Sequence, residues 1–533
     1  METLTRTFSN ISDGMPVSVI TDVSSWPMLT ALLTVVATLA FYQLVLAPPS
    51  SLRPKGSRIK PIFSSFPFLG SVGFYSDRVG FLRKHFGDPE SSSFHGDARR
   101  ITVRDATVVL LAGNKDDAKM FYYSRALKFT QAYMKLLSGI PSEITTAAIM
   151  NQDKADQMFN ENLKQAIRGE RLAKLAPLLC EDTVRALDAV PDWKKGKGSM
   201  DPKAFTFPLL FCMSMRTVGF SDLSDDPKIV EELAGYYWAM KDAASFWSTF
   251  FTKYPFRTSS LKEESGKKLF AALGKAAYSR FVKDLVEDVT VGMLLDNGMD
   301  ADYVVRYVVT GLFIAIINST SMSMWILLYL GAHSELRQRA SKELCDYLDS
   351  MAERQGTAVL FFHPQKSRVE QLQALSLAEW ENGFPTIEAA LKETIRLNAD
   401  GTQFRLNAGD ATAGTSAPKV QGEEVHKGEF LGYCDPDRWA RGEGSGDMEY
   451  LGWGTGMHPC TAHPSDYLRL LTGMRFAKLE IKNFATTILA LMDWESYNPR
   501  SGEVYTIGTL PAPQLNYGHR LPLGPVSLRF TRR

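Results

Sequence analysis

The chain has 533 residues, of which 45% are hydrophobic and 22% are charged, a composition typical of a folded globular protein and not of a disordered one. Its 60 Lys and Arg residues nearly balance its 59 Asp and Glu residues, so the basic face of a nucleic-acid-binding protein is not expected. Five cysteines without a Cys-x-x-Cys spacing argue against a disulfide scaffold and favour a reducing compartment.

Residues 28–47 form an uncharged run of twenty residues, long enough to span the hydrocarbon core of a bilayer as a helix. Trp26 precedes the run, Pro48 and Pro49 end it, and four basic residues follow directly, whereas the preceding tail is mainly acidic. Because positive flanks face the cytoplasm, the sequence predicts a membrane topology in four parts. These are a lumenal tail (1–27), a transmembrane helix (28–47), a basic, proline-containing hinge (48–60) and a cytoplasmic body (61–533). A cleaved signal peptide is the alternative.

Two further features depend on this topology. Asn10-Ile11-Ser12 is an N-glycosylation acceptor if the tail is lumenal. The apolar segment Val304–Leu330 contains Arg306 and several polar residues, so it is expected to be a buried core helix, with a second membrane span as the alternative.

Helical periodicity dominates the body. The expected helices are Asp116–Tyr123, Leu163–Ala189, Ile229–Phe251, Glu263–Asp288, Asp302–Leu330, Glu335–Arg354, Thr386–Leu397 and Arg469–Met492. Short extended pieces are expected at 101–103 and 108–111, as a hairpin, and at 402–406 and 517–531. The fold class is therefore predicted to be mainly α with small β-sheets, in a single domain.

The strongest chemical signal is the loop Trp453-Gly454-Thr455-Gly456-Met457-His458-Pro459-Cys460. Glycines let a backbone approach a planar ligand closely, and a cysteine at the end of such a loop can present a thiolate to a metal. His458 stands where it can donate a hydrogen bond to an anionic substituent of a cofactor. Taken alone, the loop also fits a glycine turn with a buried thiol, or a loose nucleotide loop.

Two charged motifs precede this loop. Glu393 and Arg396 are three residues apart on an expected helix, so they lie on one face and can pair. Arg438 stands in the turn Asp435-Pro436-Asp437-Arg438-Trp439, from which its guanidinium can join that pair. Each motif alone is more typical of a solvated surface.

Together and in this order, the three motifs resemble those of the cytochrome P450 family. That family has a Glu-x-x-Arg pair on one helix, an arginine in a later proline-containing segment, and an aromatic-x-x-Gly-x-Arg/His-x-Cys loop. The matching residues here are Glu393, Arg396, Arg438, Trp453, Gly456, His458 and Cys460. With the anchor and hinge, the resemblance is to a microsomal member. It covers essentially the whole chain and implies the cytochrome P450 fold with an N-terminal transmembrane helix.

The resemblance implies heme b as the cofactor, with the Cys460 thiolate as the axial ligand to iron. Arg405 and His458 are then expected to bind heme propionates, with Lys164 or Arg168 as a third candidate. The other matching residues are expected to shape the cofactor loop (Trp453 and Gly456) or to form a structural cluster behind the heme (Glu393, Arg396 and Arg438).

The expected helix near residues 314–320 departs from the family pattern, in which a small residue is followed by an acid and a threonine that relay protons to dioxygen. With Ala315 as the small residue, Ile317 replaces the acid and Asn318 replaces the threonine. Ser319 and Thr320 remain close as hydroxyl donors, so Asn318, Ser319 and Thr320 are the candidate catalytic residues. Asn318 resembles the branch that contains cholesterol 7α-hydroxylase and prostacyclin synthase. The alternative is an asparagine that is satisfied within its own helix.

Two segments flanking the cysteine loop also depart from the family. Residues 462–472 interrupt the turn after Cys460, and removing them joins Cys460-Thr461 to Gly473-Met474-Arg475-Phe476-Ala477, which matches the family. Residues 433–435 run directly from an extended piece into the Arg438 turn, where the family usually has some twenty more residues. Both departures are interpreted as splicing or gene-model errors.

The resemblance implies a monooxygenase of the endoplasmic reticulum membrane. It is expected to use dioxygen and electrons from NADPH, delivered by NADPH-cytochrome P450 reductase, to oxidise a lipophilic small molecule. The fungal style of the sequence favours a terpenoid or polyketide of secondary metabolism. The alternatives are a heme-thiolate isomerase or dehydratase, and an inactive membrane-anchored relic if the insertion 462–472 is real.

Overall fold

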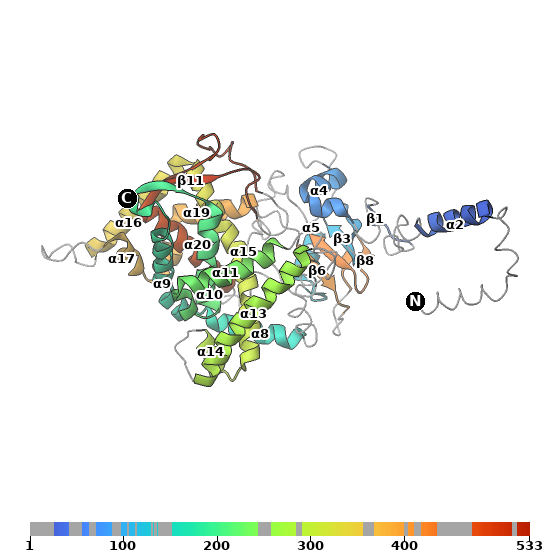
Figure 1. The fold of residues 1–533 in the computed structure, drawn as a ribbon, viewed down its shortest axis with the longest axis horizontal. Helices are drawn as coiled ribbons and strands as arrows, with labels where there is room; N and C mark the ends of the chain where they lie inside the picture. The colour runs from blue at the N-terminus through green and yellow to red at the C-terminus, as the bar shows by residue number, and fades with distance from the viewer. Residues whose placement is uncertain are drawn as a thin grey trace.

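The computed structural model of the chain has a helical body next to a smaller region built around a β-sheet, with the N-terminal helix apart from both (Figure 1). The structure describes residues 26–41, 56–62, 71–87, 97–103, 106–111, 115–128, 132, 136, 152–243, 257–283, 290–354, 367–398, 403–409, 417–433, 472–513 and 520–533.

Helices account for most of this described part. They are α2 (Trp26–Phe41), α3 (Val72–Ser76), α4 (Arg78–Phe86), α5 (Lys115–Tyr123), α8 (Gln152–Ala166), α9 (Gly169–Asp188), α10 (Pro202–Val218), α11 (Pro227–Asp242), α13 (Arg257–Lys283), α14 (Val291–Asp296), α15 (Ala301–Ala332), α16 (Ser334–Arg354), α17 (Arg368–Gln373), α18 (Leu377–Asn382), α19 (Pro385–Asn398) and α20 (Thr472–Leu491). The predicted fold class, mainly α with small sheets, is confirmed.

The larger sheet has six strands in the order β1-β2-β3-β9-β6-β4. These are β1 (Lys60–Pro61), β2 (Arg99–Val103), β3 (Ala106–Leu111), β4 (Leu127–Lys128), β6 (Gln403–Asn407) and β9 (Phe430–Tyr433). The predicted hairpin is confirmed, because β2 and β3 pair antiparallel with Ile101 opposite Val108. Strand β9 joins the two halves of the sheet, since it pairs with β3 on one side and with β6 on the other.

Two smaller sheets complete the strands. The three-stranded sheet has the order β10-β11-β5, with β5 (Lys197–Met200), β10 (Met492–Tyr497) and β11 (Ser527–Arg532). A two-stranded hairpin consists of β7 (Lys419–Val420) and β8 (Glu423–Glu424). The tail predicted to be extended therefore contributes β11, in its last residues.

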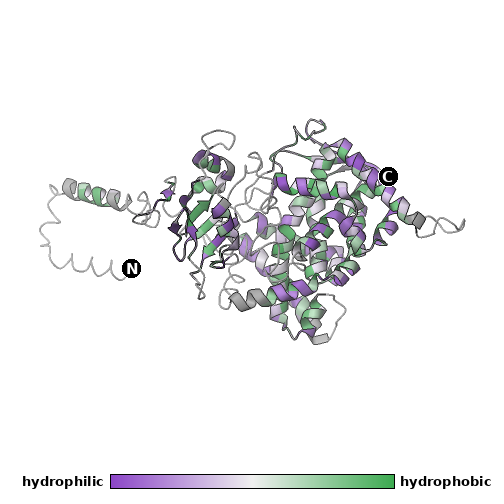
Figure 2. Cartoon of the chain, turned by 180° about the vertical axis from the view of Figure 1, so that it is seen from behind, coloured by the Kyte–Doolittle hydropathy of each residue, from purple (hydrophilic) through white to green (hydrophobic). Residues whose placement is uncertain are grey.

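The long helix α15 is the centre of the helical body. Asp300 caps its start, accepting a hydrogen bond from the backbone N–H of Tyr303 at 2.7 Å. The helix packs against α10, α13, α19 and α20, and these helices share one large apolar core. Figure 2 shows the hydrophobic residues gathered inside the helical body and in the strands.

The predicted single helix Leu163–Ala189 is wrong, because the structure has two helices there. The backbone of Arg168 is extended, with φ −64° and ψ 153°, so α8 ends before it and α9 begins at Gly169. A side chain at Gly169 would meet Arg475, since a Cβ there would lie 3.3 Å from the Nη1 atom of that arginine. The close approach of α20 therefore favours glycine at this break.

Two helices bear on the predicted membrane topology. Among the described residues, α15 is long and apolar enough to cross a membrane, but 78% of its most apolar window is buried, as expected for a core helix. Helix α2 covers most of the predicted transmembrane segment 28–47, whose last residues lie outside the described part of the chain. Large apolar side chains of α2 are exposed, including Leu32 (61%) and Leu33 (60%).

Candidate cofactor-binding site

Helix α15 is mostly buried but exposes part of one face in its middle. Ile314 is 48% exposed and Asn318 is exposed one turn later, while Thr310, Ala315 and Ile317 are half-buried. Positions four apart lie above one another on a helix, so these side chains form a continuous stripe. Most of its side chains are apolar, and Ala315 is small, as suits contact with a flat apolar ligand or an apolar substrate.

The three candidate catalytic residues do not share this face. Asn318 lies on the exposed stripe, whereas Ser319 is 2% exposed and Thr320 is fully buried. The hydroxyl of Ser319 donates to the carbonyl oxygen of Ala315 at 2.8 Å, within the helix. Thr320 Oγ1 has no hydrogen-bond partner within the described part of the chain. The structure thus brings Asn318 to the stripe and directs the two hydroxyls into the helical body.

Glu480 is a residue that the sequence reasoning missed. It lies on α20 with no exposed surface, and the hydroxyl of Ser214 on α10 donates to its Oε1 atom at 2.9 Å. Burial raises the pKa of Glu480 to about 8, although hydroxyls of Ser319 and Ser214 beside it act in the opposite direction. Glu480 is therefore a neutral acid at pH 7, next to α15. No sequence signal distinguishes Glu480, because Lys478 and Lys482 lie two residues to either side of it.

Arg405 lies on β6 and is 1% exposed. Its Nη1 atom donates to the carbonyl oxygen of Phe404 at 2.9 Å, and its guanidinium carbon lies 4.9 Å from the ring centroid of Phe121. Burial lowers the pKa of Arg405 to about 10, which leaves it charged at neutral pH. A buried guanidinium of this kind suits a ligand carboxylate.

Glu393 and Arg396 pair as the sequence predicted. The Nε atom of Arg396 donates to Glu393 Oε2 at 2.7 Å on α19, and this hydrogen bond is the main cause that lowers the pKa of Glu393. The side chain of Glu393 is 54% exposed and that of Arg396 is 33% exposed. Of the two candidates for a third propionate ligand, Lys164 is half-buried on α8 and Arg168 is exposed at the start of α9.

Several predicted site residues lie outside the described residues. They are Cys460, His458, Trp453, Gly456, Arg438 and Asn10. The described residues fit a heme in two respects: the exposed face of α15 offers apolar and small side chains to a flat macrocycle, and the buried Arg405 offers a cation to a propionate.

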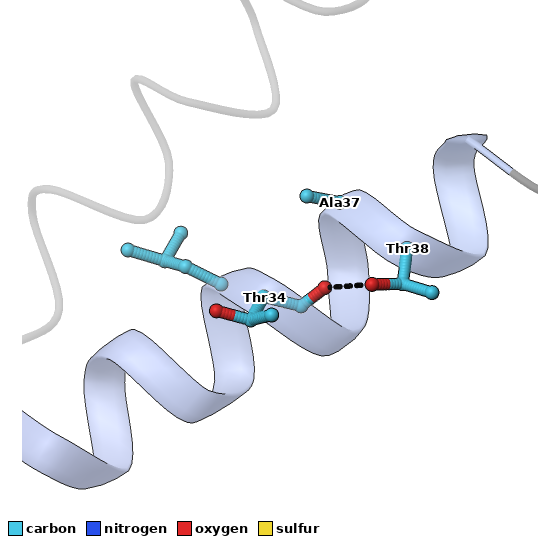
Figure 3. Close-up of a pocket in the computed structure, with 4 residues that line it drawn as sticks. Thr34, Ala37 and Thr38 are labelled. Atoms are coloured by element: carbon cyan, nitrogen blue, oxygen red, sulfur yellow. Dashed lines mark hydrogen bonds between the residues drawn. The ribbon is translucent and has the colours of Figure 1, made fainter.

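A hollow on α2 is lined by Leu33, Thr34, Ala37 and Thr38 (Figure 3). The hydroxyl of Thr38 donates to the carbonyl oxygen of Thr34 at 2.7 Å, and that of Thr34 donates to Thr30 at 2.7 Å. Both hydroxyls are thus used within the helix. The hollow is the surface of a single helix and offers no chemistry of its own.

Known proteins similar to this chain are cytochrome P450 monooxygenases of fungi. The chain is 23% identical over 503 residues to cytochrome P450 monooxygenase AacuE of Aspergillus aculeatus, covering 87% of this chain and 91% of the relative. It is 23% identical over 501 residues to cytochrome P450 monooxygenase dmxR5 of Cryptosporiopsis sp., covering 91% of both. No protein-family model matches the chain.

The fold is also found among solved structures. The retinoic acid-bound cyanobacterial CYP120A1 superposes with a TM-score of 0.63 at 17% identity, covering 89% of this chain and 99% of that protein. This match shows the shared fold, and the fungal relatives extend the similarity to the sequence of nearly the whole chain. The predicted resemblance to the cytochrome P450 family is confirmed.

Proposed function

We propose a substrate class, an electron donor and a location for this chain, which is a cytochrome P450 heme-thiolate monooxygenase. The substrate is a lipophilic small molecule of fungal secondary metabolism, such as a terpenoid or polyketide. Electrons come from NADPH through NADPH-cytochrome P450 reductase, and the enzyme is anchored in the endoplasmic reticulum membrane. The observation that carries the proposal is the mainly apolar exposed face of α15 in a chain similar to fungal monooxygenases over about nine-tenths of its length.

The residues proposed to hold the cofactor are Arg405 on β6 and residues of the loop 453–460. Cys460 provides the thiolate, and Arg405 and His458 bind the propionates, with Trp453 and Gly456 in the loop against the macrocycle. The bound heme supplies dioxygen activation, which thiolate ligation favours. Glu393, Arg396 and Arg438 form the structural cluster behind it.

The exposed stripe of α15 is the proposed wall for the substrate. Ile314 and Ala315 offer apolar surface, and Asn318 offers the single amide with which the wall can orient a hydroxyl or carbonyl group. Asn318 also takes the place at which a hydroxyl is expected to help deliver protons.

A second candidate function follows from this stripe. Between residues 314 and 318 it carries neither an acid nor a hydroxyl, as suits a heme-thiolate isomerase or dehydratase, which rearranges its substrate without consuming NADPH. Turnover of a substrate without NADPH and reductase is the result that favours this candidate.

The proposed membrane anchor is α2 with the residues that follow it. The described part of this helix exposes large apolar side chains and carries no charge, so it is suited to lipid. With the basic hinge 48–60 on the cytoplasmic side, Asn10 lies in the lumen and is glycosylated. Protection of the body from added protease in sealed microsomes is the result that contradicts this orientation.

The central experiment is the carbon monoxide difference spectrum of the reduced protein, measured on the full chain in microsomes. A Soret band of the thiolate-ligated type is expected for the wild type and is lost in Cys460→Ser. Cys345→Ser is the matched control, since Cys345 is a half-buried thiol on α16, and it retains the band. Incubation with candidate pathway intermediates and reductase then identifies the substrate by product mass. A band that survives Cys460→Ser contradicts the proposed ligand.

A further inference from the structure

Three helices meet around the carboxyl group of Glu480. It projects from α20, Ser214 reaches it from α10 with an oxygen–oxygen distance of 2.9 Å, and Ser319 lies beside it on α15. The second carboxyl oxygen, Oε2, has no hydrogen-bond partner among the residues that the structure describes. The group is fully buried.

Ser319 connects this carboxyl group to the stripe of α15. Its hydroxyl hydrogen is used in the bond to the carbonyl oxygen of Ala315 at 2.8 Å, one helical turn earlier. A serine that bonds back to its own helix in this way perturbs the local helix geometry. With its hydrogen in the bond to Ala315, the oxygen of Ser319 can accept a hydrogen bond, and the protonated form of Glu480 has a hydrogen to donate.

We propose that Glu480 is a positioning residue, which holds through Ser319 the turn of α15 that bears Ala315 and Asn318. The proposal rests on the function proposed above, in which that turn faces heme and substrate. Ionised Glu480 has no hydrogen to offer, and a buried carboxylate with few donors is unfavourable. Loss of its proton therefore releases the turn.

The charged groups on the surrounding elements do not shift the pKa of Glu480. Ion pairs on α20 and the elements around it join Asp182 with Arg216, Glu381 with Arg475, Glu388 with Lys478 and Lys482, Arg337 with Asp493, and Arg368 with Asp349. On α9, Cys180 accepts hydrogen bonds from Asn483 and Thr487, and burial raises its pKa to about 11. The pKa of Glu480 is set by burial and by two hydroxyls, without a contribution from these charges.

The test compares the wild type, Glu480→Gln and Ser319→Ala as full-length holoenzymes, with Glu388→Gln as the control. Glutamine keeps the size and the hydrogen-bond donor of the neutral acid but cannot ionise. Glu388 is an acid on α19 that Lys478 holds in its ionised form, so its replacement leaves the response between pH 6 and pH 9 unchanged. The probe is carbon monoxide on the reduced protein, whose infrared stretching band reports the position of the side chains around it.

In the wild type and in Glu388→Gln, the band is expected to shift with a midpoint near pH 8, matching the pKa of Glu480. In Glu480→Gln it stays at its low-pH position throughout. Ser319→Ala, in which the link is broken, shows the high-pH band already at pH 6. A midpoint unchanged in Glu480→Gln, or a wild-type band that does not shift up to pH 9, overturns the proposal.

Thermal unfolding provides a readout that does not depend on heme. Between pH 5 and pH 8 folded Glu480 keeps a proton that the unfolded chain has lost, so rising pH favours unfolding. The melting temperature of Glu480→Gln relative to the wild type is therefore expected to rise over this range and to level off above pH 8. If the thiolate-type Soret band is absent, the proposed function fails, whereas this comparison still tests the buried acid. A difference in melting temperature between Glu480→Gln and the wild type that stays constant with pH contradicts a neutral Glu480.

Discussion

In the six-stranded sheet, the buried charge of Arg100 is compensated by opposite charge. Arg100 on β2 has no exposed surface, and it lies 3.2 Å from Glu429 and 3.4 Å from Glu423, while its Nη1 atom donates to Ser57 at 2.7 Å. In the helical body, Glu480 is equally buried but meets only hydroxyl groups. The same degree of burial thus has different consequences for the two residues, because Arg100 lies between two carboxylates whereas Glu480 lies among hydroxyl groups, where its pKa is raised.

The difference has a consequence for pH sensitivity. Arg405 stays charged at neutral pH, because burial lowers its pKa only to about 10. Glu480 changes its charge near pH 8. Moderate alkali is therefore expected to act on the helical body, on the α15 side of the proposed heme site, and to leave the charges of the sheet in place.

The segment between β9 and α20 connects the two regions and contains Cys460. Deleting residues 462–472 joins Cys460-Thr461 to Gly473, near the start of α20. We expect the deletion to raise the heme content above that of the wild type and toward one per chain, measured by the pyridine hemochrome assay, because the thiolate then precedes the helix directly. Sequencing the transcript is the independent check. A message that encodes residues 462–472, in a protein whose heme content the deletion does not raise, contradicts this expectation.

Removing the buried charge of the sheet is expected to be the most destabilising single substitution. Arg100→Met leaves Glu423 and Glu429 without their shared cation, at a cost of about 3–5 kcal/mol in the free energy of unfolding. Urea denaturation followed by circular dichroism measures it. Arg529→Met is the matched control, since Arg529 also lies on a strand in an ion pair, but with 47% of its side chain exposed, and its cost should stay below about 1 kcal/mol. Equal losses of unfolding free energy in Arg100→Met and Arg529→Met would show that the burial of Arg100 adds nothing to its contribution.

Arg405 tests whether the second buried arginine of the sheet serves a ligand. Arg405→Lys keeps the charge but loses the planar, bidentate donor, so heme affinity is expected to fall roughly tenfold, or about 1.4 kcal/mol. Transfer of heme to apomyoglobin measures the loss. Arg532→Lys is the control, because Arg532 also stacks on an aromatic ring, 5.3 Å from the centroid of Trp193. Equal heme retention in the wild type and in Arg405→Lys excludes the propionate role.

The sequence predicts the bounds of amphipathic helices well, whereas one mostly buried helix was missed. Helices α16 and α19 lie within a few residues of their predicted bounds, because their apolar residues recur on one face. Helix α10 was not predicted, since nearly all of its residues are buried and Pro208 lies inside it. The pairing of β11 with β5 joins segments about three hundred residues apart, which no local pattern encodes.

Some residues of the candidate site could likewise be predicted from the sequence, and others could not. The cysteine loop and Arg405 were predicted from their resemblance to a family pattern, and the burial of Arg405 agrees with a site role. Glu480 was not predicted, because an isolated glutamate on a helix is usually solvated and its burial depends on three helices distant in sequence. The separation of Asn318 from Ser319 and Thr320 likewise depends on which face of α15 the neighbouring helices cover.

The smallest effect we predict concerns the stability of the fold at acidic pH. Although burial acts in the opposite direction, the hydrogen bond from Lys478 and the charges of Lys478, Lys482 and Lys392 lower the pKa of Glu388. A lowered pKa stabilises the fold above the unfolded value near 4.5, and this contribution is lost as the pH falls through the folded value. Glu388→Gln should therefore cost up to about 1 kcal/mol at pH 7 and almost nothing at pH 3, measured by urea denaturation at both pH values. The effect of pH on stability is opposite in sign to that expected for Glu480→Gln, so the two variants distinguish a paired acid from a neutral one in the same helical body. A cost for Glu388→Gln that grows toward acid pH contradicts the pairing with Lys478.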